Sequence, residues 1–198
     1  MIDRSAARKT AVLIALSAGS EGVTILVFSN AFLPPVLHPA RAIPIAAWFL
    51  AAVVSAAYIM YAMRGLPIIG KLMLNFAAFK LLGPLLAVPS AILEEVFFRQ
   101  FLMDAFIHSS PAVQILLSAF TFGLAHAVWA IRGGRQAFAG AVGSTGILGA
   151  ALAIVYLAAG RIVLPCIAAH FIINVVLEPW LMYAYVMRTR GAGGRGKA

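Results

Sequence analysis

Two adjacent glutamates, Glu94 and Glu95, stand inside the long apolar stretch 81–107, with Arg99 one helical turn later. An ionised side chain at the centre of a membrane-spanning helix costs about 2.5–3.5 kcal/mol on insertion scales. Glu95 and Arg99 are spaced i, i+4, so they share a helix face and can form an ion pair. Glu94 points about 100° away from Glu95 around the helix. The spacing therefore indicates a supporting pair, Glu95 and Arg99, beside a carboxylate that can take a proton from water.

Two histidines lie in later apolar stretches. His126 closes the segment 122–126, and His170 shares a helix face with Asn174, four residues on. Small residues flank both histidines and permit close helix packing: Gly123, Ala125, Ala127, Ala168 and Ala169. A water between Glu94 and His126 could lose a proton and attack a carbonyl carbon. His170 and Asn174 could then donate hydrogen bonds to the developing oxyanion. These residue types predict hydrolysis inside a membrane.

The composition indicates which kind of secondary structure positions these residues. The chain has 198 residues, of which 63% are hydrophobic and 11% charged, with a mean hydropathy of +0.99. A water-soluble domain needs more polar residues to cover its surface. Long unbroken apolar runs exclude a membrane β-barrel, whose strands alternate polar and apolar residues. At about 20 residues per span, the sequence predicts an all-α polytopic transmembrane bundle with about six spanning helices: 11–33, 44–63, 81–107, 112–131, 137–159 and 163–187.

The basic residues predict the orientation of this bundle. The net charge is +9, but the basic residues are scattered over loops and chain ends, a pattern that sets membrane topology and argues against a nucleic-acid partner. With both termini cytoplasmic, only Arg41 and Arg161 fall on the outer side. The inner side then carries twelve basic residues: Arg4, Arg8, Lys9, Arg64, Lys71, Lys80, Arg132, Arg135, Arg188, Arg190, Arg195 and Lys197. We therefore predict a multi-pass protein of the cell membrane with both ends inside.

The chain is predicted to form one integral membrane domain, residues 1–187, followed by a disordered basic cytoplasmic tail, residues 188–198. Residues 66–79 are moderately apolar but interrupted by Lys71, and they predict an interfacial amphipathic segment, with a short extra span as the alternative. The first apolar stretch could be a cleaved signal peptide, although it reaches spanning length. The oligomeric state is not readable from the sequence.

Three motifs follow one another along the chain, each inside a span: Glu-Glu-x-x-x-Arg at 94–99, Phe-x-x-x-His at 122–126 and His-x-x-x-Asn at 170–174. In this order they resemble the CPBP intramembrane proteases, a family that includes type II CAAX prenyl endopeptidases and Abi-type bacterial membrane proteins. The resemblance covers about residues 85–180. Several members have eight spans where this chain has about six, so the resemblance leaves the substrate open.

The resemblance implies an endopeptidase that cleaves a membrane-associated or lipid-anchored protein or peptide, with membrane lipids around it and no metal or other cofactor. Glu94 and His126 would then activate water, and His170 with Asn174 would form the oxyanion hole. Glu95 and Arg99 would support the site.

Other functions remain open on the sequence alone. A non-catalytic immunity or scaffold protein could use the same fold, and a buried network of Glu, Arg and His side chains could line an ion path. Two glutamates and two histidines could hold zinc in a metal-dependent protease, but the His-Glu-x-x-His arrangement is absent. Cys166 lies one turn before His170, a spacing that a Cys–His dyad could use, but a small buried apolar role is favoured.

The fifth span carries glycines at i, i+3 spacing, which predicts tight helix packing rather than chemistry: Gly140, Gly143, Gly146 and Gly149.

Overall fold

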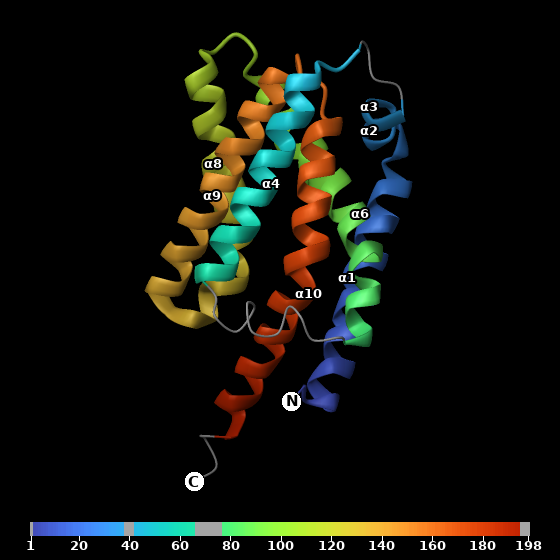
Figure 1. Cartoon of the computed structure of the whole chain (residues 1–198), viewed down its shortest axis with the longest axis vertical. Helices are drawn as coiled ribbons and strands as arrows, with labels where there is room; N and C mark the ends of the chain where they lie inside the picture. Colours follow the sequence, from blue (N-terminus) through green and yellow to red (C-terminus); the bar gives the residue numbers. More distant parts are fainter. Residues whose placement is uncertain (1, 38–41, 66–76, 195–198) are drawn as a thin grey trace. The chain divides into compact units, whose positions relative to one another are not determined.

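The computed structural model describes residues 2–37, 42–65 and 77–194, and every regular element in these ranges is helical (Figure 1). Five helical stretches are long and apolar enough to cross a membrane: Arg4–Val27, Ile45–Gly65, Ala78–Ala105, Gly134–Ala158 and Leu164–Met187. A sixth apolar helix, α8 (Pro111–Ala127), is shorter, with 17 residues, and continues as the 3-10 helix η3 (Val128–Gly133). These helices confirm the predicted helical membrane bundle.

The first two spans differ from the sequence prediction mainly at the start of the chain. Helix α1 (Arg4–Val27) begins before the predicted apolar stretch 11–33 because the carboxylate of Asp3 caps it, accepting a hydrogen bond of 2.8 Å from the Ala6 N–H. Two single-turn helices follow, α2 (Ser29–Phe32) and α3 (Pro34–Leu37). Helix α4 (Ile45–Gly65) agrees with the predicted second span. Most of the predicted interfacial segment, residues 66–76, lies outside the described residues.

The third apolar stretch is a composite of four helical elements. A 3-10 helix, η1 (Ala78–Leu82), leads into α6 (Gly83–Glu95), which contains Pro89. A π-helical turn, η2 (Val96–Phe101), follows directly and passes into α7 (Leu102–Ala105). A π-turn forms i→i+5 hydrogen bonds and is frequently found at functional sites. Here it begins at the residue after the glutamate pair, and so places Arg99 on a wider turn than an α-helix would.

The chain divides into two compact units. The first comprises Met1–Ser29, Ser55–Ala91 and His170–Ala198. Within it the Asp3 N–H donates a hydrogen bond of 3.0 Å to the Tyr183 hydroxyl, and the ring of Phe79 stacks on Tyr183 with ring centres 5.5 Å apart. The start of α1 and the late part of α10 (Leu164–Gly194) therefore lie at the same end of this unit (Figure 1).

Helix α10 continues to Gly194, into the stretch 188–198 that the sequence predicts as a disordered tail, so the first part of that stretch is helical. Residues 195–198 lie outside the described residues. Helices α6 and α10 pack closely in the first unit: a Cβ added at Gly83 would lie 3.0 Å from Cγ of Pro179.

The second unit comprises Asn30–Val54 and Ile92–Ala169, and its centre is the pair α8 and α9 (Gly134–Ala158). A Cβ on Gly146 would lie 3.3 Å from the Ala119 carbonyl oxygen, and one on Gly149 3.1 Å from the Ala119 α-carbon. The predicted tight packing of the glycine-rich span is thus confirmed for Gly146 and Gly149. Gly140 and Gly143 have no described neighbour within 4 Å of an added Cβ and take no part in it.

A polar cluster joins α7, α8 and α9 at one end of the second unit. The Tyr156 hydroxyl donates to Asp104 at 3.0 Å, and the guanidinium of Arg161 donates to Asp104 and to Gln114. Arg161 follows Gly160, and both have positive φ angles, 67° and 66°. This left-handed turn brings the Arg161 side chain back onto the helices it has just left. The cluster stabilises the turn between α9 and α10 by joining it to α7 and α8.

Candidate active site

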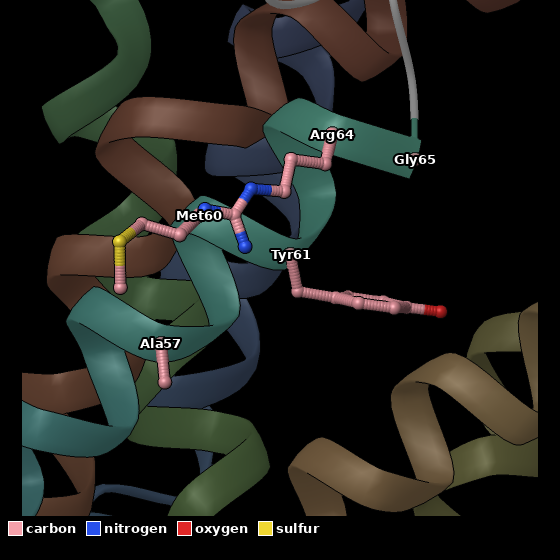
Figure 2. Close-up of a pocket in the computed structure, with 5 residues that line it drawn as sticks. All are labelled: Ala57, Met60, Tyr61, Arg64 and Gly65. Carbon is pink, nitrogen blue, oxygen red and sulfur yellow. The ribbon is translucent and has the colours of Figure 1, made fainter.

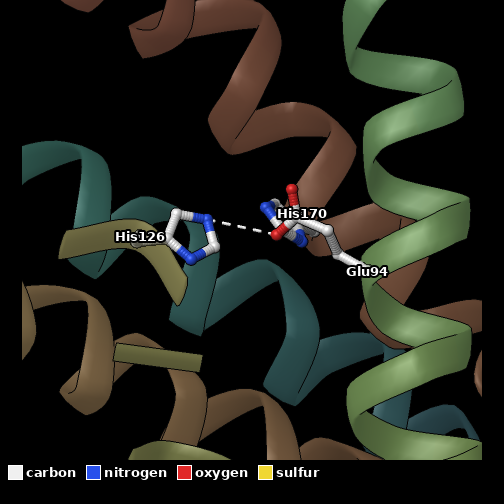
Figure 3. Close-up of side chains that lie close together, drawn as sticks. All are labelled: Glu94, His126 and His170. Atoms are coloured by element: carbon white, nitrogen blue, oxygen red, sulfur yellow. Dashed lines mark ion pairs between the residues drawn. The ribbon is translucent and has the colours of Figure 1, made fainter. Parts of the chain in front are cut away.

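The last turns of α6 and α8 bring Glu94 and His126 together within the second unit. Glu94 Oε2 lies 3.1 Å from His126 Nε2, as the dashed line in Figure 3 marks; the figure draws this pair together with His170. The side chains are 21% and 28% exposed, respectively, so both are half-buried yet reachable. A carboxylate and an imidazole at this distance can exchange a proton directly.

A hydrogen bond at Nδ1 of His126 leaves the other ring nitrogen, Nε2, to face Glu94. Nδ1 lies 2.9 Å from the Phe122 carbonyl oxygen, which can only accept, so Nδ1 carries a proton. Nε2 and the carboxylate of Glu94 would repel each other as two acceptors unless a proton lay between them. By its distance the contact is an ion pair and not an aligned hydrogen bond, and a proton carried by either group would face the other.

A fully buried ion pair stands next to this couple. Glu95 and Arg99 are both 0% exposed, with Arg99 Nε 3.0 Å from Oε2 and Nη2 3.3 Å from Oε1 of Glu95. Arg99 Nη1 also donates to Ser118 Oγ at 3.1 Å, and the Ser118 hydroxyl donates to the Phe98 carbonyl at 3.3 Å. The guanidinium thus donates hydrogen bonds from Nη2 to Glu95 and from Nη1 to Ser118, whereas Nε lies at ion-pair distance from Glu95 without an aligned hydrogen bond.

The Phe122 ring links the buried pair to His126. Its centre lies 4.7 Å from the Arg99 guanidinium, and the ring stacks on the His126 imidazole with ring centres 4.2 Å apart. Arginine over an aromatic face is an attractive cation–π contact. Phe122 therefore packs against both Arg99 and His126.

A cavity of about 370 Å³ opens beside the couple. It is lined by Glu94 and His126 together with four apolar residues: Leu93, Phe97, Phe98 and Ala125. An apolar wall with a few converging polar groups is the usual character of a ligand site. Phe97 is 49% exposed and offers an aromatic face to an incoming chain. The cavity thus combines an apolar wall with one carboxylate and one imidazole.

His170 and Asn174 belong to α10 in the first unit. His170 is buried, 2% exposed, and Asn174 Nδ2 donates to Ser90 Oγ at 3.3 Å. Ser90 lies on α6, one turn before Glu94, and is itself buried. Neither Ser90 nor Ser118 was predicted from the sequence. Helical spacing carried the signal for both, since Ser90 precedes Glu94 by four residues and Ser118 precedes His126 by eight.

Three side chains offer atoms that bind metal ions. Glu94, His126 and His170 supply one carboxylate oxygen and two imidazole nitrogens, all of them ligand types that zinc accepts. Cys166 does not add to this set, because its thiol is fully buried and donates to the Leu152 carbonyl at 3.3 Å. Its environment is that of a small buried residue.

A larger cavity, about 550 Å³, is lined by the last turns of α4 in the first unit: Ala57, Met60, Tyr61, Arg64 and Gly65. Figure 2 shows the Arg64 side chain extending over Met60, whereas Tyr61 points the other way. This lining holds neither a carboxylate nor a histidine, so it lacks a group that could activate water. Of the two cavities, the smaller one is lined by a carboxylate and a histidine, Glu94 and His126.

The position of His126 depends on the close approach of α8 and α9, which Gly123→Ala tests. A Cβ at Gly123 would lie 2.6 Å from the Val142 carbonyl oxygen, so the two helices must separate. We expect a loss of about 1–3 kcal/mol in stability, the range for overpacking, measured by thermal unfolding in detergent. Gly143→Ala, on α9 with open space around it, is the matched control and should keep or raise stability, by up to about 1 kcal/mol, because alanine favours a helix. Equal stability of the two variants would contradict the packing argument.

Comparison with known proteins places these residues in a family. The family model described as type II CAAX prenyl endopeptidase Rce1-like matches residues 76–176, a range that holds all three sequence motifs and both units' site residues. This confirms the family expected from the motifs. No curated protein and no solved structure matches the chain.

Proposed function

Because the chain belongs to the type II CAAX prenyl endopeptidase Rce1-like family, we propose that it is a glutamate-dependent endopeptidase of the membrane. It hydrolyses a peptide bond in a membrane-associated or lipid-anchored protein or peptide, with water activated by Glu94 and His126. The observation that carries the proposal is the 3.1 Å contact of these two side chains at an apolar cavity. The family and the apolar helices make it a multi-pass membrane protein with a lipid surrounding and a peptide substrate.

In the proposed cycle one proton passes between the two side chains. In the ion-paired form the Glu94 carboxylate takes a proton from water as the water oxygen bonds to the carbonyl carbon. His126 then gives its Nε2 proton to the peptide nitrogen, and the carbon–nitrogen bond breaks. The Glu94 carboxylic acid finally returns a proton to His126 Nε2 across the 3.1 Å contact. One water is consumed, and both side chains regain their starting forms.

We further propose that His170 and Asn174 donate hydrogen bonds to the oxyanion. Support comes from the register of α6 and α10 in the first unit. Gly83 on α6 packs against Pro179 on α10, and Ser90, later on α6, accepts a hydrogen bond from Asn174, earlier on α10. The helices are antiparallel there. His170 precedes Asn174 by one turn, so both proposed donors share the face of α10 that packs on α6 at Ser90.

The test of this function compares peptide termini, by mass spectrometry of membrane and secreted fractions, between cells with wild-type protein and cells with Glu94→Gln. New termini found only with the wild type would establish proteolysis and identify the substrate. Identical termini, with both proteins folded and equally abundant, would replace the proposal by the non-catalytic alternative, an immunity or scaffold protein of the same fold.

Removal of metal ions provides a separate prediction. Since the proposed cycle needs only protons and water, chelators and dialysis against metal-free buffer should leave the cleavage rate unchanged, measured on the peptide that the terminus comparison identifies. Loss of activity on stripping, with recovery on added zinc alone, would instead make Glu94, His126 and His170 the ligands of a metal that activates the water.

The orientation in the membrane is likewise a proposal: both termini are cytoplasmic. The contact of Asp3 with Tyr183 supports it, because it holds the start of α1 and the late part of α10 at one end of their unit. A fluorescent protein fused to the C-terminus should fluoresce, and alkaline phosphatase fused there should be inactive. Phosphatase inserted at Gly160 should be active, since that turn carries one of the two outer basic residues. The reverse pattern would invert the topology.

A further inference from the structure

We propose that Ser90 is a positioning residue that holds the side-chain amide of Asn174 in the orientation needed for oxyanion binding. The inference rests on the proposed function of Asn174 and adds a residue outside the three sequence motifs. Its basis is the hydrogen bond from Asn174 Nδ2 to Ser90 Oγ, 3.3 Å long, and the burial of Ser90, which is 2% exposed.

An asparagine amide needs such a partner because its two ends have nearly the same shape and opposite polarity. The nitrogen carries two donors and the oxygen only accepts. An amide turned by 180° would direct its oxygen at the oxyanion and repel the charge that it should stabilise. Catalysis by Asn174 therefore requires that one end of the amide be fixed by a group that distinguishes nitrogen from oxygen.

The hydroxyl of Ser90 makes this distinction because of its place in a helix. A serine inside a helix commonly directs its own proton to the carbonyl of the preceding turn, which leaves its lone pairs for an outside donor. Asn174 Nδ2 satisfies one lone pair with one of its two N–H groups. The second N–H diverges from the first and is directed away from Ser90, so it is the one that can donate to an oxyanion.

A spectroscopic experiment tests the bond without any substrate. The side-chain signals of asparagines labelled with ¹⁵N are recorded in detergent micelles, and those of Asn174 are identified by their loss in Asn174→Ala. We expect Ser90→Ala to shift these signals and to speed their hydrogen exchange, whereas Ser90→Thr, which keeps the hydroxyl, preserves them. Ser55→Ala, a buried serine on α4 of the same unit, is the matched control and should leave them unchanged. Unchanged Asn174 signals in Ser90→Ala would overturn the inference.

A double-mutant cycle tests whether the bond acts in catalysis, with the peptide from the terminus comparison as substrate. Ser90→Ala should lower kcat about tenfold, the loss expected for one hydrogen bond, with KM changed by less than about twofold because the oxyanion exists only after attack. In the Asn174→Ala background Ser90→Ala should have no further effect. Additive losses would refute the positioning role and leave the proposed function standing. Wild-type kcat in Asn174→Ala would instead refute the role proposed for Asn174 itself.

Discussion

Replacement of Glu94 by glutamine is expected to lower kcat by about 10³-fold or more, near the upper range for loss of a general base. Glutamine matches glutamate in size but accepts no proton near neutral pH. It also removes the negative charge that lies 3.1 Å from His126 Nε2, so an imidazolium at His126 is no longer stabilised by Glu94. Both halves of the proposed cycle fail together. The measurement is the initial rate with purified protein in detergent or liposomes, on the peptide identified from its new termini.

Two further variants make this result specific. Glu21→Gln neutralises another glutamate within a span, on α1 and outside the lining of the cavity, and should keep kcat within about twofold of wild type. His126→Gln should lower kcat as much as Glu94→Gln does. The double variant should be no slower than either single variant, because losses in residues that act as one unit do not add. Wild-type turnover by a folded Glu94→Gln protein would end the assignment of Glu94 as the base.

Replacement of Arg99 by methionine is expected to cost about 3–5 kcal/mol of stability, the range for a buried ion pair deprived of one partner. Methionine fills much of the volume but leaves the Glu95 carboxylate, 0% exposed, without its counter-charge, and Ser118 without a donor. The readout is the folded fraction after detergent extraction and its thermal midpoint. Arg64→Met, at an exposed cation on α4, is the control and should change stability by less than about 0.5 kcal/mol.

The double variant Glu95→Leu with Arg99→Met separates charge from shape. Since neither side chain is then charged, most of the lost stability should return, as it does when apolar residues replace a buried pair. Catalysis should recover less, because the guanidinium that lies 4.7 Å from the Phe122 ring centre is gone and His126 stacks on that ring. Arg99→Met as stable as wild type would show that the pair contributes nothing to folding.

The sequence predicted the features that depend on spacing along one helix. The pair of Glu95 and Arg99 is of this kind, since four residues always return to the same face. The helical membrane fold followed from hydropathy, because a spanning segment needs its length in apolar residues and little else. The family followed from three ordered motifs, and a family model over residues 76–176 confirmed it.

Features that depend on how separate helices meet were beyond the sequence. The contact of Asn174 with Ser90 requires the register of α10 against α6, and that of Arg99 with Ser118 requires the rotation of α8. Many side chains of similar size could have filled either place, so the helical spacing that relates Ser90 to Glu94 and Ser118 to His126 was not enough to identify these two serines. The start of α1 was mispredicted for a local reason. Hydropathy does not detect a helix cap, and the cap at Asp3 lets the helix begin in polar residues before the apolar stretch.

The π-turn Val96–Phe101 also bears on how this chain is aligned with other proteins. Such a turn is equivalent to an α-helix that has acquired one extra residue. A homologue that keeps a plain α-helix here would differ from this chain by a single gap between Glu95 and Leu102. An alignment that forbids gaps inside spans would then displace every later position of the helix by one. Asp104, whose carboxylate accepts hydrogen bonds from Tyr156 and Arg161, would then be aligned with the wrong residue of the homologue.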